Sequence, residues 1–353
     1  MLETLETAII FKISVLSILS FLIAFFCTPI LTHFLYKYKL GKQIRDSKDT
    51  PVFSAMHKDK EGTPTMGGIL IWGTVLIVAV IFYLLSIFFP GSFFDKLNFI
   101  NRAQTWLPLG AMLLGALIGL IDDYLGILRI GPKGGGLSMS YRLLLYTFVA
   151  IICSLWFYFK LDWDTLHIPF VGAFQIGWWY IPLFIFVIVA SAFSVNETDG
   201  LDGLAGGTLA TTFAALGAIC FAQGKFELAT FCGVIMGALI AFLWFNINPA
   251  RFFMGDTGAM SLGITVGIIA MLTNTALLLP VIGIIFVIES LSVIIQIISK
   301  KIRKKKVFIS APIHHHLQAI NWSEPKIVMR FWLISSISAV VGIIIFLADK
   351  GLY

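Results

Sequence analysis

The sequence predicts an all-α polytopic membrane protein with about ten transmembrane helices and one small outer β-hairpin. Only 12% of its 353 residues are charged and 58% are hydrophobic, whereas soluble domains carry roughly 25% charged residues. The apolar residues gather in runs long enough to cross a bilayer, and the basic residues gather in alternate loops. Because a lipid-exposed backbone must satisfy its own hydrogen bonds, runs of this length predict helices. No soluble segment of useful size is left, so residues 1–353 form a single integral-membrane domain.

Ten apolar runs define the expected spans, each near or above the roughly 17–25 residues that a crossing helix needs. The boundary between the eighth and ninth runs is the least marked, because only Asn274 and Thr275 interrupt it. The runs cover residues 9–36, 66–89, 105–121, 141–159, 177–195, 204–222, 228–245, 258–274, 277–299 and 331–348.

The loops between these runs alternate in charge. Loops on one side hold 19 of the 25 lysines and arginines, loops on the other side hold five, and Lys12 lies inside the first run. The positive-inside rule places the richer side in the cytoplasm and both termini outside. The net charge of +6 therefore encodes orientation, and we expect membrane lipids and no nucleic acid as partners. The single cysteines within apolar runs are typical of small core residues.

One outer loop has the pattern of a β-hairpin. Residues 167–170 and 173–176 flank the turn pair Val171-Gly172, which is typical of two short strands joined by a tight turn. We expect this hairpin to cover the outer surface without chemistry of its own.

The unusual polar residues all fall on the predicted cytoplasmic side. An ionisable residue at the end of a span is costly unless it is paired or hydrated, which makes each one a functional candidate. Asp122 and Asp123 end the third run, and adjacent helical residues point about 100° apart, so both can face one cavity. Two carboxylates near a phosphate indicate Mg²⁺. The alternative is a solvated helix end.

Two further groups follow at the ends of later runs. Asn196, Asp199 and Asp202 are spaced by three among glycines, so they line one face if the segment is helical or turn-like. They could bind a metal or a nucleoside, hold sodium in a broken transporter helix, or form a polar cap between two helices. Asn246 and Asp256 bracket a proline-containing loop. Asp256 is either a functional acid or the N-cap of the next helix.

A basic loop and a histidine cluster complete the candidates. Lys60 precedes the Gly62–Gly68 segment; a lysine here can meet phosphate charge, although the segment is no Walker A loop. His314, His315 and His316 are consecutive. Their side chains diverge, so we expect hydrogen-bond donors or proton carriers and no shared zinc ion.

Five segments in this order resemble the polyprenyl-phosphate sugar-1-phosphate transferases. They are residues 62–68, 122–124, 196–203, 242–256 and 311–316. The form Ala-Pro-Ile-His-His-His at 311–316, followed by Glu-Pro-Lys at 324–326 and Arg-Phe-Trp at 330–332, resembles the phospho-MurNAc-pentapeptide branch of that family. Gly126 and Arg142 stand where lysine is frequent in the family, with Arg129 or Lys133 as substitutes for the first.

The resemblance implies a Mg²⁺-dependent enzyme that uses UDP-MurNAc-pentapeptide and undecaprenyl phosphate and releases lipid I and UMP. It also implies ten spans and a homodimer. Asp122, Asp123 and Asp256 match the catalytic acids and metal ligands, with Asp256 as the principal ligand. The histidines match the catalytic cluster. The positions matching substrate-binding residues are Lys60, Thr65, Lys133, Asn196, Asp199, Asp202, Asn246 and Phe253.

Three alternatives stay open at this point. The donor could be UDP-GlcNAc, as in other branches of the family. The chain could be an ion-coupled transporter, although a transporter places its charges near the membrane midplane. The reaction could be one direct attack after Asp122 accepts a proton, or two steps through a phosphoryl-aspartate.

Overall fold

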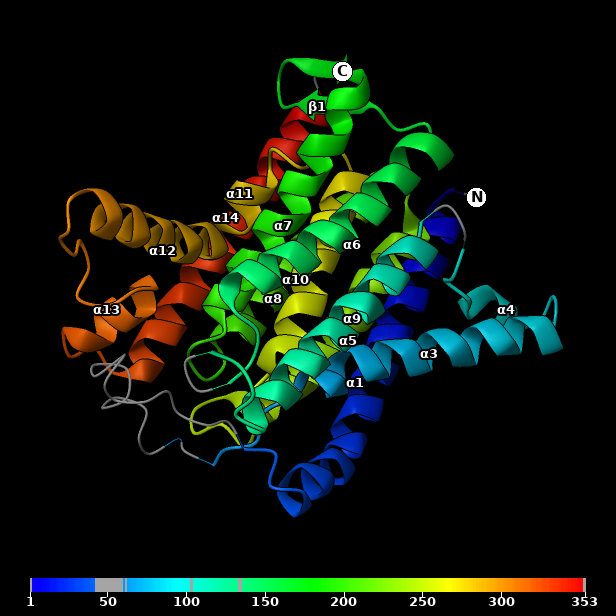
Figure 1. Cartoon of the computed structure of the whole chain (residues 1–353). Coiled ribbons are helices and arrows are strands. Elements are labelled where there is room, and N and C mark those ends of the chain that lie inside the picture. The colour runs from blue at the N-terminus through cyan, green and yellow to red at the C-terminus, as the bar shows by residue number, and fades with distance from the viewer. Residues whose placement is uncertain (1, 42–59, 61, 102–103, 133–134, 352–353) are drawn as a thin grey trace.

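The computed structural model describes residues 2–41, 60, 62–101, 104–132 and 135–351, and these form a helical bundle (Figure 1). The predicted fold class is confirmed. The long helices are α1 (Leu2–Lys37), α3 (Gly68–Phe88), α5 (Trp106–Ile127), α6 (Met139–Lys160), α7 (Tyr180–Thr198), α8 (Leu204–Ala222), α9 (Phe226–Asn246), α10 (Gly255–Leu272), α12 (Ile284–Ile302) and α14 (Glu324–Lys350). The short helices are α4 (Phe93–Leu97), η3 (Gly177–Trp179), α11 (Leu279–Ile282) and α13 (Ile313–Ala319).

Nine helices in the described part of the chain are long and apolar enough to cross a membrane, and α12 is not among them. The predicted ninth run, 277–299, breaks at Gly283 into α11 and α12. Helix α12 also carries Glu289, Lys300 and Lys301, and it projects sideways from the other helices (Figure 1). Hydropathy alone did not show this break, because the residues on both sides of it are apolar.

The predicted hairpin is present at one end of the bundle, but its first strand lies two residues and its second strand one residue earlier than predicted, so that Gly172 is paired in the second strand. Strand β1 (Thr165–Ile168) pairs antiparallel with β2 (Gly172–Gln175). His167 Nε2 lies 2.5 Å from Asp349 Oδ2 near the end of α14, and the Phe170 N–H donates to Asp349 Oδ1 at 2.6 Å. These contacts fix the hairpin to the C-terminal end of the last helix.

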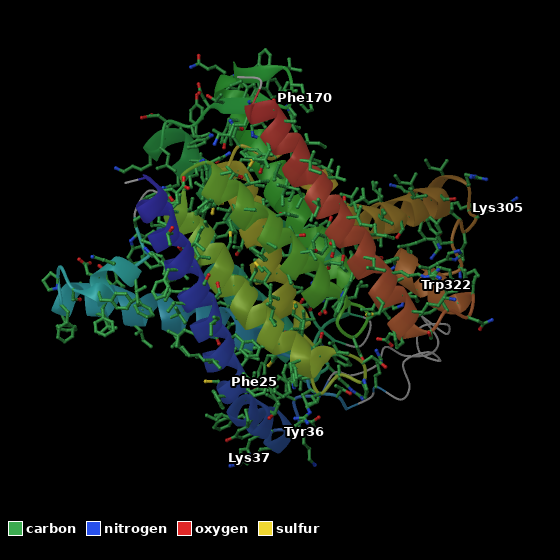
Figure 2. All side chains as sticks on the ribbon, turned by 180° about the vertical axis from the view of Figure 1, so that it is seen from behind. Phe25, Tyr36, Lys37, Phe170, Lys305 and Trp322 are labelled. Carbon is green, nitrogen blue, oxygen red and sulfur yellow. The ribbon has the colours of Figure 1, made fainter. Side chains whose placement is uncertain are left out.

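Both chain ends lie toward the hairpin end of the bundle (Figure 1). Near the N-terminus, Lys12 Nζ donates to the Asn98 carbonyl in the predicted outer loop at 2.6 Å. Figure 2 shows Phe170 of the hairpin at one end and Tyr36 and Lys37 of α1 at the other. The two ends of the bundle therefore match the two sides assigned from the loop charges.

Helix α10 is the buried centre of the bundle. Every residue of this helix except Asp256 is buried, and α5, α7, α3 and α8 pack around it. The outer helices instead expose large apolar side chains, such as Phe26, Phe159 and Ile337 at 66–70% exposure. An apolar exterior around a buried core is the arrangement expected of a protein whose solvent is lipid.

Helices α5 and α10 approach each other through Gly119. A Cβ atom at this position would lie 2.2 Å from the Asp256 carbonyl oxygen and 2.5 Å from the Thr257 Cα. Since neither backbone atom can rotate away, only glycine permits the observed distance. The close contact brings the end of α5, with its two aspartates, against the start of α10.

Gly119→Ala is expected to destabilise the bundle by about 1–3 kcal/mol, because the added methyl group overpacks a rigid helix contact. The thermal unfolding midpoint of the detergent-solubilised protein measures the effect. Gly110→Ala in the same helix is the matched control, since a Cβ there meets nothing within 4 Å. Equal midpoints for the two variants would contradict the contact.

Candidate functional site

The first turn of α10 is held by a carboxylate from α5. Asp123 Oδ1 accepts from the Asp256 N–H and Oδ2 accepts from the Thr257 N–H, both at 3.1 Å. Thr65 Oγ1 donates to the same carboxylate at 3.3 Å. A buried helix N-terminus needs partners for its unpaired N–H groups, and a negative charge also suits the helix dipole. The sequence allowed Asp256 to be the N-cap of this helix. In the structure the N-cap position is Met254, whose side chain makes no capping hydrogen bond. Asp123 caps the helix instead.

The predicted glycine-rich segment pairs with the loop before α10. The Phe253 N–H donates to the Pro64 carbonyl, and the Gly67 N–H donates to the Phe253 carbonyl, each at 2.8 Å. On the other side, Asn246 donates to the Phe252 carbonyl at 2.8 Å and accepts from the Gly203 N–H at 2.9 Å. The side-chain amide of Asn246 thus holds two backbone segments, one through its nitrogen and one through its oxygen. Asn246 is buried.

Arg142 of α6 joins three of the predicted polar residues. Its Nε lies 2.7 Å from Asp122 Oδ2, and its Nη2 lies 3.1 Å from Asp256 Oδ2. Its Nη1 donates to Asn196 Oδ1 at 3.1 Å, and Asn196 Nδ2 donates to Asp256. Asp122 Oδ1 also accepts from the Leu137 N–H at 2.5 Å. The Asp122 side chain is fully buried, whereas that of Asp256 is 20% exposed, so Asp256 is the more accessible acid.

A second charged group surrounds Lys60. Its Nζ lies 2.6 Å from both Asp202 Oδ1 and Glu324 Oε1, and Glu324 Oε1 accepts from the Asp202 N–H at 2.6 Å. Asp202 Oδ2 accepts from Asn248 Nδ2 and from the Ala250 N–H. Lys60 also lies 5.8 Å from the centre of the Phe253 ring. Lys60 thus contacts two acids and one aromatic ring.

The sequence predicts a common face for Asn196, Asp199 and Asp202 if their segment is helical or turn-like, and in the structure each of the three contacts different partners. Helix α7 ends at Thr198, so Asn196 is helical while the other two lie in the loop beyond. Asn196 contacts the Arg142 group, and Asp202 contacts Lys60. Asp199 Oδ2 accepts from the Gly255 N–H at 3.2 Å. Asn196 and Asp199 therefore contact the start of α10, through the Asp256 side chain and the Gly255 N–H, whereas Asp202 contacts Lys60.

His314, the first of the three histidines, packs against the loop that carries Asp199 and Asp202, at Gly200. His314 is fully buried, and its Nδ1 lies 2.9 Å from Oε2 of the equally buried Glu289. Burial, aided by the charge of Lys60, lowers the pKa of His314 to about 3, so its ring is neutral at neutral pH. A Cβ at Gly200 would lie 2.2 Å from His314 Nε2. The glycine here therefore makes room for the histidine, which supports the loop from below.

The three histidine side chains have different polar partners, and the rings of His314 and His315 contact each other with their centres 4.1 Å apart. His315 Nδ1 lies 2.9 Å from Gln318 Oε1, and His316 Nδ1 accepts from the Ile309 N–H at 3.3 Å. Within the described ranges, no three His, Cys, Asp or Glu side chains are arranged to hold a metal ion.

The acidic residues nevertheless fit a magnesium ion shared with a substrate. Mg²⁺ binds through one or two carboxylates together with phosphate oxygens and water, without a cage made wholly by the protein. Asp122 and Asp256 both contact the single guanidinium of Arg142. Two carboxylates facing one cation leave an excess of negative charge, and their oxygens are the hard ligands that Mg²⁺ prefers.

Known proteins match this chain over most of its length. Phospho-N-acetylmuramoyl-pentapeptide-transferase from Chloroflexus aggregans is 41% identical over 324 residues, which cover 88% of this chain and 83% of the relative. Proteins of the same name from Geobacillus sp. (strain WCH70) and Bacillus anthracis are 37% and 38% identical, and cover 93% and 92% of the chain and 96% and 95% of the relatives.

The chain belongs to the phospho-N-acetylmuramoyl-pentapeptide-transferase family. A model described as signature 1 of this family matches residues 60–71, which hold Lys60 and Thr65. A model of glycosyl transferase family 4 matches residues 105–274, which hold all the aspartates of the candidate site: Asp122, Asp123, Asp199, Asp202 and Asp256. The two matches together cover the segments that converge around the start of α10.

Members of this network that the sequence did not single out as site residues are Arg142, Glu289 and Glu324. Each is an ionisable residue near a helix end or within an apolar helix, and that position was the available signal. Their partners lie elsewhere in the sequence, so only the fold reveals the pairing. Lys133, predicted to contact phosphate, lies outside the described residues.

Arg142→Gln is expected to lower the thermal unfolding midpoint of this family member, because it leaves the buried Asp122 carboxylate without its ion-pair partner. Loss of one partner from a buried pair costs about 3–5 kcal/mol, and the 21% exposure of the arginine side chain makes this an upper range. Adding Asp122→Asn should recover much of the loss, since the second change removes the uncompensated charge. Strictly additive losses in this double-mutant cycle would argue against the ion pair.

Proposed function

We propose that this chain transfers phospho-MurNAc-pentapeptide from UDP-MurNAc-pentapeptide to undecaprenyl phosphate, giving lipid I and UMP. The supporting observation is that the acids, amides and single arginine around Asp256 converge at one end of a membrane bundle. They do so in a chain 37–41% identical to proteins named for this transfer. The shared family also favours a transferase over the transporter alternative.

The reaction is proposed to take place at the cytoplasmic face of a bacterial inner membrane. Supporting this orientation, the loops at the site end carry most of the basic residues, and such loops stay in the cytoplasm. An active site there has access both to a soluble nucleotide and to a lipid phosphate in the inner leaflet. The homodimer expected from the resemblance stays a prediction.

Binding of the nucleotide-sugar is assigned to the Lys60 side of the network. The Phe253 ring beside Lys60 offers an aromatic face for a base, and Lys60 offers a charge for phosphate. Asp199 and Asp202 are hydrogen-bond acceptors in the adjacent loop. Thr65 and Asn246 act indirectly, because the first contacts Asp123 and the second holds two backbone segments.

The acids around Arg142 are proposed to face the pyrophosphate. When bound there, Mg²⁺ would offset the charge that develops on the departing UMP. Asp256 is the proposed principal ligand because it is the accessible acid and points toward Asn196 and Arg142. Arg142 places Asp122 and Asp256 on one side of the same guanidinium, which orients both carboxylates before substrate arrives.

The transfer step forms one phosphorus–oxygen bond and breaks another. An oxygen of the lipid phosphate attacks the sugar-linked β-phosphorus, and the bond from that phosphorus to the bridging oxygen breaks, so that UMP leaves with the electron pair. Asp122 is the proposed acceptor of any proton on the attacking phosphate. Both of its oxygens are engaged by Leu137 and Arg142, so this role requires Arg142 to shift toward the substrate. In the two-step alternative an aspartate attacks first.

Assay of the purified protein with each donor tests the proposed function. With undecaprenyl phosphate and Mg²⁺ present, UMP release is expected from UDP-MurNAc-pentapeptide and not from UDP-GlcNAc. Release only from UDP-GlcNAc would assign the chain to another branch of sugar-1-phosphate transfer, and flux into proteoliposomes without UMP release would support transport. Donor labelled in its β-phosphate and incubated without lipid separates the two mechanisms, since only the two-step route labels the protein.

Asp256→Ala is expected to abolish transfer, by at least about a hundredfold, while the protein still inserts and elutes normally. Removal of divalent ions with EDTA should silence the wild type, and Mg²⁺ should restore it. The matched control is Asp95→Ala in α4, an exposed segment near the opposite end of the bundle. Near-normal turnover of Asp256→Ala at saturating Mg²⁺ would refute its role as metal ligand. Rescue by Zn²⁺ alone would redirect attention to the histidines.

A further inference from the structure

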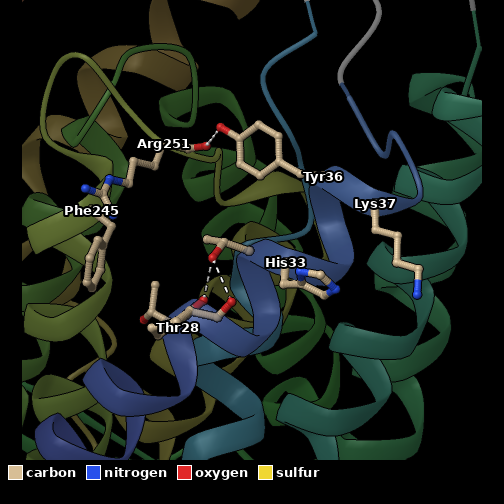
Figure 3. Close-up of a pocket in the computed structure, with 8 residues that line it drawn as sticks. Thr28, His33, Tyr36, Lys37, Phe245 and Arg251 are labelled. Atoms are coloured by element: carbon tan, nitrogen blue, oxygen red, sulfur yellow. Dashed lines mark hydrogen bonds between the residues drawn. The ribbon is translucent and has the colours of Figure 1, made fainter.

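A groove of about 740 Å³ lies between the end of α1 and the loop that follows α9. We call it the α1–α9 groove. It is lined by Thr32, His33, Tyr36 and Lys37 from the last turns of α1 and by Phe245 and Arg251 across from them. Figure 3 shows Arg251 and Phe245 on one wall and the α1 side chains on the other. None of the residues assigned to the transfer reaction lines this groove.

The described residues that line the groove carry positive charge and no negative charge. Arg251 packs its guanidinium over the Phe245 ring at 5.4 Å, and the groove lining includes no acidic residue. Of the ion pairs formed within the described ranges, none involves Arg251 or Lys37. Lys37 extends away from Arg251 (Figure 3), so it adds to the local field while Arg251 is the direct contact. An exposed cluster of this kind attracts an anion.

The surface next to the groove is apolar. Phe26 and Ile30 of α1 are 70% and 60% exposed, and Trp244 of α9 is 69% exposed. Phe25 lies between the two helices, with its ring centre 6.0 Å from that of Trp244 and 5.3 Å from that of Phe245. These side chains form an apolar surface that begins at the cationic groove and follows the membrane-spanning part of the helices. A molecule with a negative head and acyl chains matches both parts.

The loop that forms one wall separates the groove from the candidate site. The Arg251 carbonyl accepts from the Tyr36 hydroxyl at 3.0 Å, and the Arg251 N–H donates to the Phe245 carbonyl. Asn248 and Ala250 of the same loop instead donate to Asp202. The groove and the acids thus contact different residues of one loop. An anion beside Arg251 therefore occupies a site of its own.

We propose that the α1–α9 groove binds the phosphate headgroup of an anionic phospholipid from the surrounding leaflet. Arg251 contacts the phosphate, Lys37 adds positive potential, and the acyl chains lie along Phe26, Ile30 and Trp244. Basic pockets between membrane helices on the cytoplasmic side are typical headgroup sites. Only the assignment to the inner leaflet rests on the proposed orientation, because the binding itself needs no transferase activity.

Binding is tested with the full chain in detergent by native mass spectrometry during titration with phosphatidylglycerol or phosphatidylcholine of the same acyl chains. Wild type is expected to prefer phosphatidylglycerol. Arg251→Gln should reduce that preference about fivefold, the effect of one basic residue worth about 1 kcal/mol. The matched control is Arg330→Gln, since Arg330 also packs over an aromatic ring, that of Trp322 at 4.5 Å, but does not line the groove. Equal losses in the two variants would reduce the effect to general surface charge and overturn the proposal.

A photoactivatable phosphatidylglycerol locates the bound lipid. Crosslinks are expected in residues 25–37 and 244–251 of the wild type and should fade in Arg251→Gln. Labelling confined to other segments would overturn the assignment. Inorganic phosphate is expected not to compete, because it lacks the acyl chains. Competition by an equal amount of undecaprenyl phosphate would instead identify the groove as a substrate site, and this result too would overturn the proposal. All of these outcomes are measurements of lipid binding, so they can be obtained even if the protein has no transferase activity.

Discussion

The site depends on one buried interaction, the carboxylate of Asp123 at the start of α10. This helix is buried along its whole length except at Asp256, so water cannot satisfy its first N–H groups, and leaving them unpaired in an apolar setting is costly. Asp123 accepts from two of them. It can do so because Gly119, one turn earlier, lets the two helices approach. With the helix start satisfied from outside, the Asp256 side chain does not cap its own helix and contacts Arg142 and Asn196 instead.

The same interaction separates the roles of two adjacent acids. Residues next to each other on a helix diverge by about 100°, so when Asp123 faces the start of α10, Asp122 must face elsewhere. It faces Arg142, which also contacts Asp256 and Asn196. The guanidinium balances only one of the two carboxylates in a poorly solvated setting. The remaining negative charge is a reason for the site to take up a cation together with a phosphate, and this reasoning favours a metal ion bound with substrate over one held in advance.

Local patterns in the sequence predicted what local physics controls. Hydropathy located the spans, loop charge separated the two ends, and the pair Val171-Gly172 marked the hairpin. The break at Gly283 was missed because it lies between apolar segments. The common face of Asn196, Asp199 and Asp202 depended on a helical or turn-like segment, and α7 ends at Thr198, between the first residue and the other two. The cap at Asp256 and the partners of Arg142, Glu289 and Glu324 depend on contacts between distant segments, and no local pattern contains them.

The buried pair of Glu289 and His314 connects the sideways helix α12 to this site. Both side chains are fully buried, and an ionisable pair in such a place is rarely a source of net stability. The pair is better understood through what it touches. His314 fills the space beside Gly200, in the loop that carries Asp199 and Asp202. The direction of α12 thereby determines where α13 lies, and α13 in turn supports the loop that faces Lys60. The break at Gly283, which hydropathy did not show, is therefore part of how the site is shaped.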